Sequence, residues 1–189
     1  MIIVLNGPLG IGKTTLAELL SERIEHCAMI DGDHLAAVNP APADPVDHLH
    51  SAIVLLVEHH RRHAYDHFII NHLWASPSDL RDLYRRLSDL DEQVACFRLV
   101  LDRDANLSRI ARRASARVVD EGDYERATYR LEHDQLSQAA GDELGRPLDA
   151  SGTPDEIADA LLARLTMEHS GAEQARARQV SRVAPGRPV

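Results

Sequence analysis

The sequence has little of several features that mark particular classes of protein. Aromatic residues make up only 4% of the 189 residues, whereas proteins that bind single-stranded nucleic acid stack bases on aromatic rings. The two cysteines, Cys27 and Cys96, are too few for a disulfide framework. The longest strongly apolar run, residues 53–57, is too short to cross a bilayer, and the N-terminus lacks the basic segment of a signal peptide. We therefore expect a soluble cytoplasmic protein without membrane contacts.

Basic residues are fewer than acidic ones, 21 against 30, and lysine is almost absent. The formal net charge is −9 at pH 7, which argues against nucleic acid or an anionic membrane surface as a partner. Of the 21 basic residues only Lys13 is a lysine, so arginine accounts for 21 − 1 = 20. One position therefore keeps a compact ammonium group where every other basic position carries a planar guanidinium. Lys13 is the first candidate for a specific chemical role.

Short apolar segments alternate with amphipathic helical patterns along the chain. The spacing predicts strands at 1–5, 28–30, 68–70, 94–101 and 147–149. It predicts helices from Lys13 to about residue 24, then at 47–65, 77–87, 104–116, 123–140 and 154–167. This alternation predicts an α/β fold with a mostly parallel, five-stranded sheet and helices on both faces. We expect one domain over residues 1–168 and a disordered tail over 169–189, where the apolar period is lost.

Residues 7–14 read G-x-x-x-x-G-K-T between the first predicted strand and the first predicted helix. Glycines let backbone N–H groups turn inward around an anion, and the helix points its positive end at the same place. This spacing in this context is typical of a phosphate loop. We predict that Lys13 bridges the β- and γ-phosphates of ATP and that the Thr14 hydroxyl holds Mg²⁺. The predicted ATP-binding residues of the loop are Gly7, Pro8, Leu9, Gly10, Ile11, Gly12, Lys13, Thr14 and Thr15.

With this loop the chain resembles the small P-loop kinases, a group that includes gluconate kinase, shikimate kinase, adenylylsulfate kinase and chloramphenicol phosphotransferase. The resemblance covers residues 1 to about 167 and is most specific at the phosphate loop. It implies a P-loop NTPase fold with a five-stranded parallel core. It also implies a helical lid, here at about residues 109–125, and the ATP-dependent phosphorylation of a small molecule.

Two carboxylates, Asp31 and Asp33, follow the second predicted strand with Gly32 between them. Polar groups at the carboxyl end of a parallel strand lie where α/β sheets bind ligands. The D-G-D stretch is similar to that of gluconate and adenylylsulfate kinases. We expect Asp31 to bind the hydrated Mg²⁺ and Asp33 to accept the proton of the acceptor hydroxyl. The alternative is an ordinary Asp-Gly turn.

The third predicted strand is followed by Asn71, where many P-loop ATPases carry an acidic residue. This departure weakens a reading as a motor-type ATPase, because such enzymes need a carboxylate to orient Mg²⁺ or water. Asn71, His72 and Trp74 are expected to line the acceptor pocket. For Trp74, the only tryptophan, an equal alternative is a role as a packing anchor.

Arg109, Arg113 and Arg117 are four residues apart and share one helix face, with Arg112 adjacent. The R-x-x-x-R spacing is similar to the arginines at the lid entry of gluconate kinase-like proteins. We expect Arg109 and Arg113 to stabilise the transferring phosphoryl group, and Arg109 also to contact the nucleotide. The alternative is a solvated basic face paired with nearby acids.

Residues 149–153 connect the last predicted strand to the last predicted helix. In the resembling families this loop packs on the adenine, which implies nucleotide contacts for Ser151 and Gly152. The alternative is a plain strand–helix connection.

These observations favour an ATP-dependent phosphotransferase that acts on a hydroxyl of a small molecule, with ATP and Mg²⁺ as cofactors. The acceptor classes left open are a sugar acid, a nucleoside or nucleotide, and an antibiotic-like alcohol. A different class remains as the alternative, namely a nucleotide-binding switch ATPase that acts through a protein partner. The GTPase version is disfavoured because a sole lysine at Lys13 excludes an N-K-x-D guanine motif.

Overall fold

The computed structural model describes residues 1–115 and 122–167. Its one sheet has the strand order β2-β3-β1-β4-β5, and all four neighbouring pairs are parallel. The strands are β1 (Ile2–Asn6), β2 (Cys27–Asp31), β3 (His67–Asn71), β4 (Val94–Val100) and β5 (Arg146–Asp149). The predicted fold class is confirmed, with a sheet that is wholly rather than mostly parallel.

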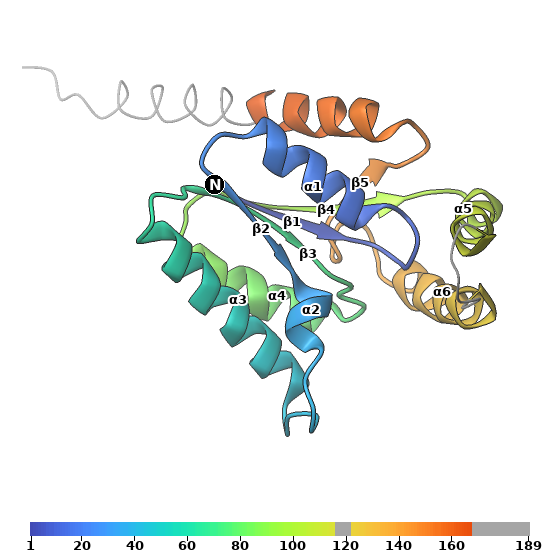
Figure 1. Ribbon diagram of the computed structural model, residues 1–189, viewed down its shortest axis with the longest axis horizontal. Helices are drawn as coiled ribbons and strands as arrows, with labels where there is room; N and C mark the ends of the chain where they lie inside the picture. The colour runs from blue at the N-terminus through green and yellow to red at the C-terminus, as the bar shows by residue number, and fades with distance from the viewer. Residues whose placement is uncertain (116–121, 168–189) are drawn as a thin grey trace, which may run out of the picture.

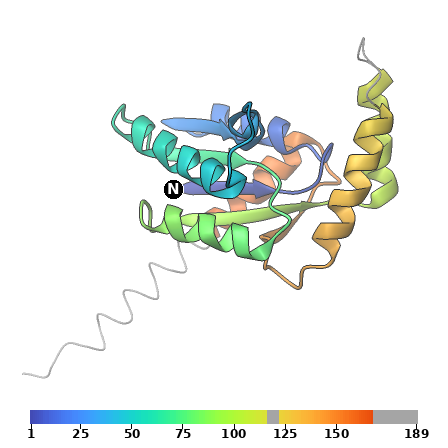
Figure 2. The same cartoon turned by 90° about the horizontal axis from the view of Figure 1, so that it is seen from below.

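Helices cover both faces of this sheet (Figure 1). One face carries α1 (Lys13–Arg23) and a helix of residues 154–167, and the other carries α3 (Pro45–Arg61) and α4 (Pro77–Ser88). A short helix, α2 (Gly32–Ala36), follows β2. Two further helices, α5 (Arg103–Ser115) and α6 (Gly122–Ser137), lie side by side across the end of the sheet where the strands have their carboxyl ends (Figure 2). These two helices therefore face the edge where ligands bind in such folds.

The central strand β1 has all five of its residues buried, and its side chains alternate between two cores. Ile2 and Val4 belong to the core under α3 and α4, whereas Ile3 and Leu5 belong to the core under α1. Each such aliphatic side chain contributes about 1.5–3 kcal/mol of burial free energy relative to exposure. The strand that leads into the phosphate loop is thus the most firmly held strand of the sheet.

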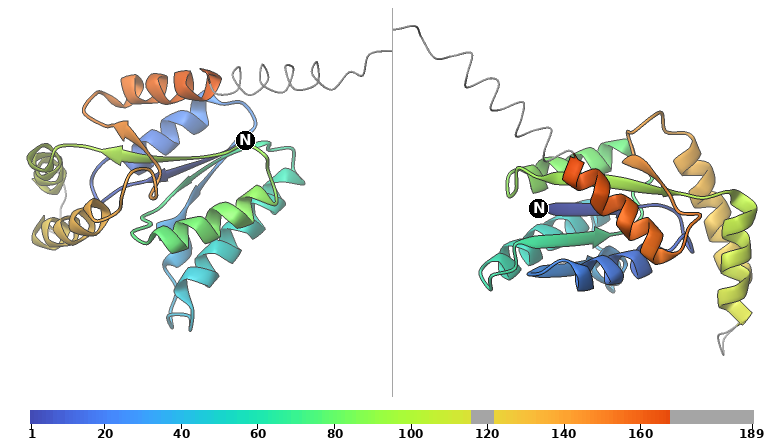
Figure 3. Two further views of the ribbon diagram at one scale, coloured as in Figure 1. Left: turned by 180° about the vertical axis from the view of Figure 1, so that it is seen from behind. Right: turned by 90° about the horizontal axis from the view of Figure 1, so that it is seen from above.

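The predicted helix starts at α4 and at residues 154–167 are confirmed by their caps. The Ser76 hydroxyl accepts from the backbone N–H of Asp79 at 3.4 Å, with Pro77 at the first helical position. Thr153 and Glu156 form a reciprocal capping box, with Thr153 N to Glu156 Oε2 at 2.8 Å and Glu156 N to Thr153 Oγ1 at 3.3 Å. Arg23 of α1 pairs with Asp155 and Asp159, which fastens the 154–167 helix beside α1 (Figure 3).

Some boundaries differ from the prediction. The stretch after β2, for which an Asp-Gly turn was the alternative, is the helix α2. The Asp31 side chain caps it by accepting from the Asp33 N–H at 2.9 Å, which satisfies one of the donors at the helix start. Helix α3 ends at Arg61, not near residue 65. The predicted tail at 169–189, and residues 116–121 of the predicted lid, lie outside the described residues. No helix of the described residues has the length and apolarity to traverse a membrane.

Candidate active site

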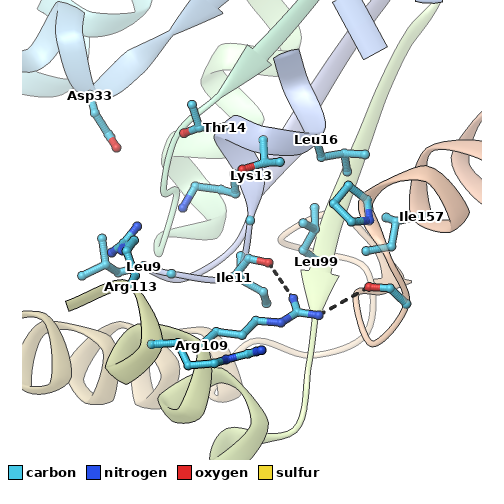
Figure 4. A pocket seen from close by; sticks show the side chains of 16 residues that line it. Leu9, Ile11, Lys13, Thr14, Leu16, Asp33, Leu99, Arg109, Arg113 and Ile157 are labelled. Atoms are coloured by element: carbon cyan, nitrogen blue, oxygen red, sulfur yellow. Dashed lines mark hydrogen bonds between the residues drawn. The ribbon is translucent and has the colours of Figure 1, made fainter. Parts of the chain in front are cut away.

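The phosphate loop connects the central strand β1 to α1 and lines a cavity of about 610 Å³ (Figure 4). Gly10 and Gly12 have φ values of +77° and +107°, a left-handed conformation that favours glycine. A Cβ at Gly10 would lie 2.5 Å from Cγ1 of Ile110, so α5 packs directly on the loop. The residues lining the cavity are Leu9, Gly10, Ile11, Gly12, Lys13, Thr14, Thr15, Leu16, Asp33, Leu99, Arg109, Arg112, Arg113, Gly152, Pro154 and Ile157.

Lys13 bends back over its own loop. Its Nζ donates to the carbonyl oxygens of Gly7 at 2.8 Å and Pro8 at 3.2 Å. Burial lowers the pKa of this ammonium, and the carboxylates of Asp33, Glu132 and Asp31 oppose that effect. The sole lysine is therefore half-buried at the phosphate loop, with three carboxylates near enough to stabilise its charge.

The two groups predicted to hold the metal, Thr14 and Asp31, come together beside α1 through Asn71, which the sequence predicts for the acceptor pocket. Asn71 Nδ2 donates to Asp31 Oδ2 at 3.1 Å and lies 3.5 Å from Thr14 Oγ1. Asn71 is fully buried, and its Oδ1 has no hydrogen-bond partner among the described residues. Hydroxyl, carboxylate and amide oxygens are the ligands that Mg²⁺ prefers. The described residues contain no cluster of three or more His, Cys, Asp or Glu side chains for a metal, so an ion here would take most of its ligands from phosphate and water.

Asp33 faces the cavity and is held by a histidine from the neighbouring strand end. His72 Nδ1 lies 2.5 Å from Asp33 Oδ1, and the Asp33 side chain remains 62% exposed. The hydrogen bond from His72 holds the pKa of Asp33 below its usual range, so this carboxyl group is ionised at neutral pH. A Cβ at Gly32 would lie 2.7 Å from Cβ of His72, so glycine at this position lets the two strand ends approach.

The two predicted arginines point in different directions. The Arg109 guanidinium donates to the carbonyl oxygens of Ile11 at 3.2 Å, Ala150 at 2.8 Å and Gly152 at 3.5 Å. Figure 4 shows it beneath the loop, on the side of Lys13 that faces Ile157. Arg113 pairs with the buried Glu125 of α6 at 2.6 Å. Arg117 lies outside the described residues.

No known family profile and no curated protein matches the sequence. Solved structures do match. The chain is similar to the tunicamycin resistance protein of Deinococcus radiodurans at 23% identity and a TM-score of 0.62, over 87% of this chain and 94% of that one. It is similar to a gluconokinase from Sinorhizobium meliloti at 17% identity and a TM-score of 0.68, over 92% and 95% of the two chains. A shikimate kinase from Aquifex aeolicus matches at 15% identity and a TM-score of 0.58, over 89% and 98%.

The fold is that of the P-loop kinases. At these sequence identities the likeness concerns the fold, and it confirms the resemblance seen in the sequence. It also fits the sheet order, in which β1 lies between β3 and β4, so the phosphate loop emerges at the point where the chain switches sides.

Two of the predicted contacts take a different form within this P-loop kinase fold. Trp74 is 3% exposed in the core, where its Nε1 donates to Nε2 of the buried His50 at 3.1 Å. The packing alternative for Trp74 is therefore confirmed, and the prediction that it walls the pocket is wrong. Ser151 donates from its N–H and its hydroxyl to the Asp149 carboxylate, both at 2.9 Å, whereas Gly152 lines the cavity.

Sequence reasoning missed one acid of the site altogether. Glu132 of α6 accepts from the backbone N–H of Leu9 at 2.6 Å, so a carboxylate from a distant helix rests on the phosphate loop. Burial raises the pKa of this group. Glu132 lies among many charged residues of α6, and its spacing gives no signal that would separate it from a solvated acid.

Proposed function

We propose that the protein is an ATP-dependent phosphotransferase that moves the γ-phosphoryl group of Mg-ATP to a hydroxyl of a small molecule. The observation that supports this most is that Lys13 of the phosphate loop and Asp33, which is held by His72, line one cavity. A protein that only binds a nucleotide would need the phosphate loop but no carboxylate facing it. A carboxylate kept ionised across the cavity from the lysine is the group that hydroxyl phosphorylation requires.

In this reaction the acceptor oxygen attacks the γ-phosphorus while its proton passes to the Asp33 carboxylate. The new O–P bond forms as the bond from the γ-phosphorus to the β–γ bridging oxygen breaks, and ADP leaves. Lys13 stabilises the charge that develops on the β- and γ-phosphate oxygens. Bound Mg²⁺ would neutralise charge on the same phosphates, and Thr14, with Asp31 and Asn71 beside it, would hold it.

Arg109 and Arg113 are proposed to have different roles. The three carbonyl contacts of Arg109 favour a role at the base end of the nucleotide, together with Gly152, over direct contact with the transferring group. Arg113, held by Glu125, keeps the predicted role near the phosphoryl group. Both roles remain predictions.

The test is ADP release from Mg-ATP, measured with a panel of hydroxylated acceptors and with Lys13→Ala as the blank. One acceptor that raises release well above the rate without acceptor, and loses this effect in Lys13→Ala, supports the phosphotransferase. Nucleotide binding with slow hydrolysis that ignores every acceptor contradicts it and favours the switch ATPase.

A further inference from the structure

The side chain of Asn6 spends all of its hydrogen-bonding capacity on backbone groups around the active site. Asn6 ends β1, one residue before the phosphate loop, and is fully buried. Its Oδ1 accepts from the N–H groups of Gly7 at 2.8 Å and Trp74 at 2.9 Å. Its Nδ2 donates to the carbonyl oxygens of Trp74 at 2.9 Å and Leu144 at 3.0 Å. A side-chain amide has two donor hydrogens and two acceptor lone pairs, so none is left for a ligand.

These four hydrogen bonds join three segments that are distant in sequence. Gly7 begins the phosphate loop, and its carbonyl oxygen accepts from Lys13 Nζ at 2.8 Å. Trp74 belongs to the loop after β3, and Leu144 belongs to the segment that leads from α6 to β5. The other four residues of β1 are aliphatic, so the strand itself does not require an amide here. The polar side chain therefore serves the loops around it.

The contact with Trp74 leads on to the proposed base. The Trp74 indole meets the His72 imidazole edge to face, with ring centroids 5.1 Å apart. The His72 ring in turn holds Asp33, with Nδ1 2.5 Å from Oδ1. The backbone N–H of His72 also donates to the carbonyl oxygen of Leu5 in β1 at 3.3 Å. The loop that carries His72 is thus fastened to the end of β1 at two successive residues, Leu5 and Asn6.

Transfer to a hydroxyl requires the base and the γ-phosphate to stand at a fixed separation. The phosphate loop and Lys13 place the γ-phosphate, and Asp33 takes the proton. The Asp33 side chain is 62% exposed, so little besides the His72 ring restrains it. Asn6 is hydrogen-bonded directly to the phosphate loop and to the loop that carries His72. One buried amide therefore connects the two sides of the reaction.

We propose that Asn6 is a positioning residue that sets the place of His72 and Asp33 relative to the phosphate loop. This inference rests on the proposed phosphotransferase function and adds to it a residue outside the cavity lining. Asn6 acts through the main chain of Trp74 and the His72 ring, without contact to nucleotide or acceptor. The alternative is a buried amide that only stabilises the fold, and the test separates the two.

The main variant is Asn6→Asp, which keeps the size of the side chain and its two acceptor contacts but removes both N–H donors. Asn6→Ser, which shortens the side chain and removes the amide, is the second variant. Trp74→Phe is the matched control, because it removes a hydrogen bond of the same loop and leaves those of Asn6 in place. Asp134→Asn, which removes an exposed acid of α6, is the surface control. Melting curves define a temperature at which the variants are folded.

ADP release from Mg-ATP is measured with gluconate, cytidine, cytidine 5′-monophosphate and chloramphenicol as probes of the acceptor classes left open. With the most active of these acceptors, both Asn6 variants should lower kcat about ten- to a hundredfold, because the base is misplaced. The Kd for Mg-ATP, measured by calorimetry, should change far less, since the phosphate loop and Lys13 are retained. Trp74→Phe and Asp134→Asn should keep the kcat of the wild type.

Two readouts respond to positioning and not to a loss of stability. If Asn6 acts through His72, Asn6→Asp should lower kcat by a smaller factor in a His72→Ala background than in the wild type, whereas independent effects would multiply. Asn6→Ser adds no titratable group and loosens the hydrogen bond that keeps the pKa of Asp33 low. The acidic limb of kcat/KM should therefore move to higher pH in this variant.

Four results would overturn the positioning role. They are a wild-type kcat in the folded Asn6 variants, an equal fall of kcat in Trp74→Phe, multiplying effects of Asn6→Asp and His72→Ala, and an acidic limb that stays in place. If neither Asn6 variant folds, Asn6 serves stability alone, and the proposal is again wrong.

Failure of the underlying function gives a different result. If Mg-ATP does not bind to the wild type, or if no acceptor raises ADP release above the Lys13→Ala blank, the phosphotransferase itself fails and the positioning role falls with it. If the wild type responds to an acceptor and the Asn6 variants respond equally, only the positioning role is wrong.

Discussion

The end of the cavity proposed for the nucleotide is built mainly from backbone groups, whereas the end proposed for the acceptor is built from side chains. At the nucleotide end, the loop after β1 supplies N–H groups and Arg109 bonds three carbonyl oxygens. At the end proposed for the acceptor, Asp33 lines the cavity, and its carboxylate is held by the side chain of His72, which follows the neighbouring strand. A site made of backbone groups keeps its hydrogen-bonding groups when side chains are substituted. A site made of side chains loses a hydrogen-bonding group with each substitution. Substrate choice is therefore expected to depend on the acceptor end.

The largest expected effect follows from removing the proposed base. Asp33→Asn keeps the size of the side chain but cannot take the acceptor proton, so kcat should fall about 10²- to 10⁴-fold. The affinity for Mg-ATP should change far less, because the phosphate loop is intact. Stopped assays of ADP release and calorimetric Mg-ATP binding measure the two quantities. Asp134→Asn is the control, and undiminished turnover in Asp33→Asn would show that another group takes the proton.

A second prediction concerns the boundary between the acceptor end and the core. Trp74→Phe removes the donor to His50 Nε2 and leaves a buried ring nitrogen unpaired, which should lower the free energy of unfolding by about 1–3 kcal/mol. Turnover at a temperature where the variant is folded should be close to that of the wild type. Urea unfolding measures the change. Tyr84→Phe, which removes an exposed hydroxyl bonded to Val94 O, is the matched control. If Trp74→Phe is as stable as the wild type but binds the acceptor poorly, Trp74 lines the acceptor pocket after all.

The same difference explains how much of the site the sequence predicts. The phosphate loop is continuous in sequence, so its motif predicts both the fold and the place of Lys13 and Thr14. The positions of Asp31 and Asp33 are also predicted, because the end of a strand is visible in the neighbouring residues of the sequence. The contacts His72–Asp33 and Glu132–Leu9 join residues 39 and 123 positions apart, and no local pattern encodes such pairs. The role of Trp74 could not be decided for the same reason, because Trp74 lies in the loop after β3 and its partner His50 lies on α3, 24 positions away.

At the nucleotide end a side-chain change should have a smaller effect, confined to binding. Arg109→Ala removes the guanidinium that donates to the carbonyl oxygens of Ile11, Ala150 and Gly152. The phosphate loop and the loop after β5 then lose the hydrogen bonds that connect them. We expect Kd for Mg-ATP and Mg-ADP to rise about tenfold each, with kcat nearly unchanged. Titration calorimetry gives both constants, and Arg103→Ala, an exposed arginine of α5, is the control. A fall in kcat without a change in Kd would instead place Arg109 on the transferring phosphoryl group.

The smallest expected effect is a displacement of a pH profile. The hydrogen bond from His72 favours the ionised form of Asp33 and lowers its pKa, so His72→Ala should raise that pKa towards the ordinary value of about 3.9. The acidic limb of kcat/KM should therefore move to higher pH, while the rate at pH 7 changes little through this effect, since Asp33 is ionised in both proteins. His34→Ala, which removes a weaker influence on the same carboxyl, should move the limb less. A limb that moves to lower pH, or that responds equally to both variants, would mean that the His72–Asp33 bond does not control the proposed base.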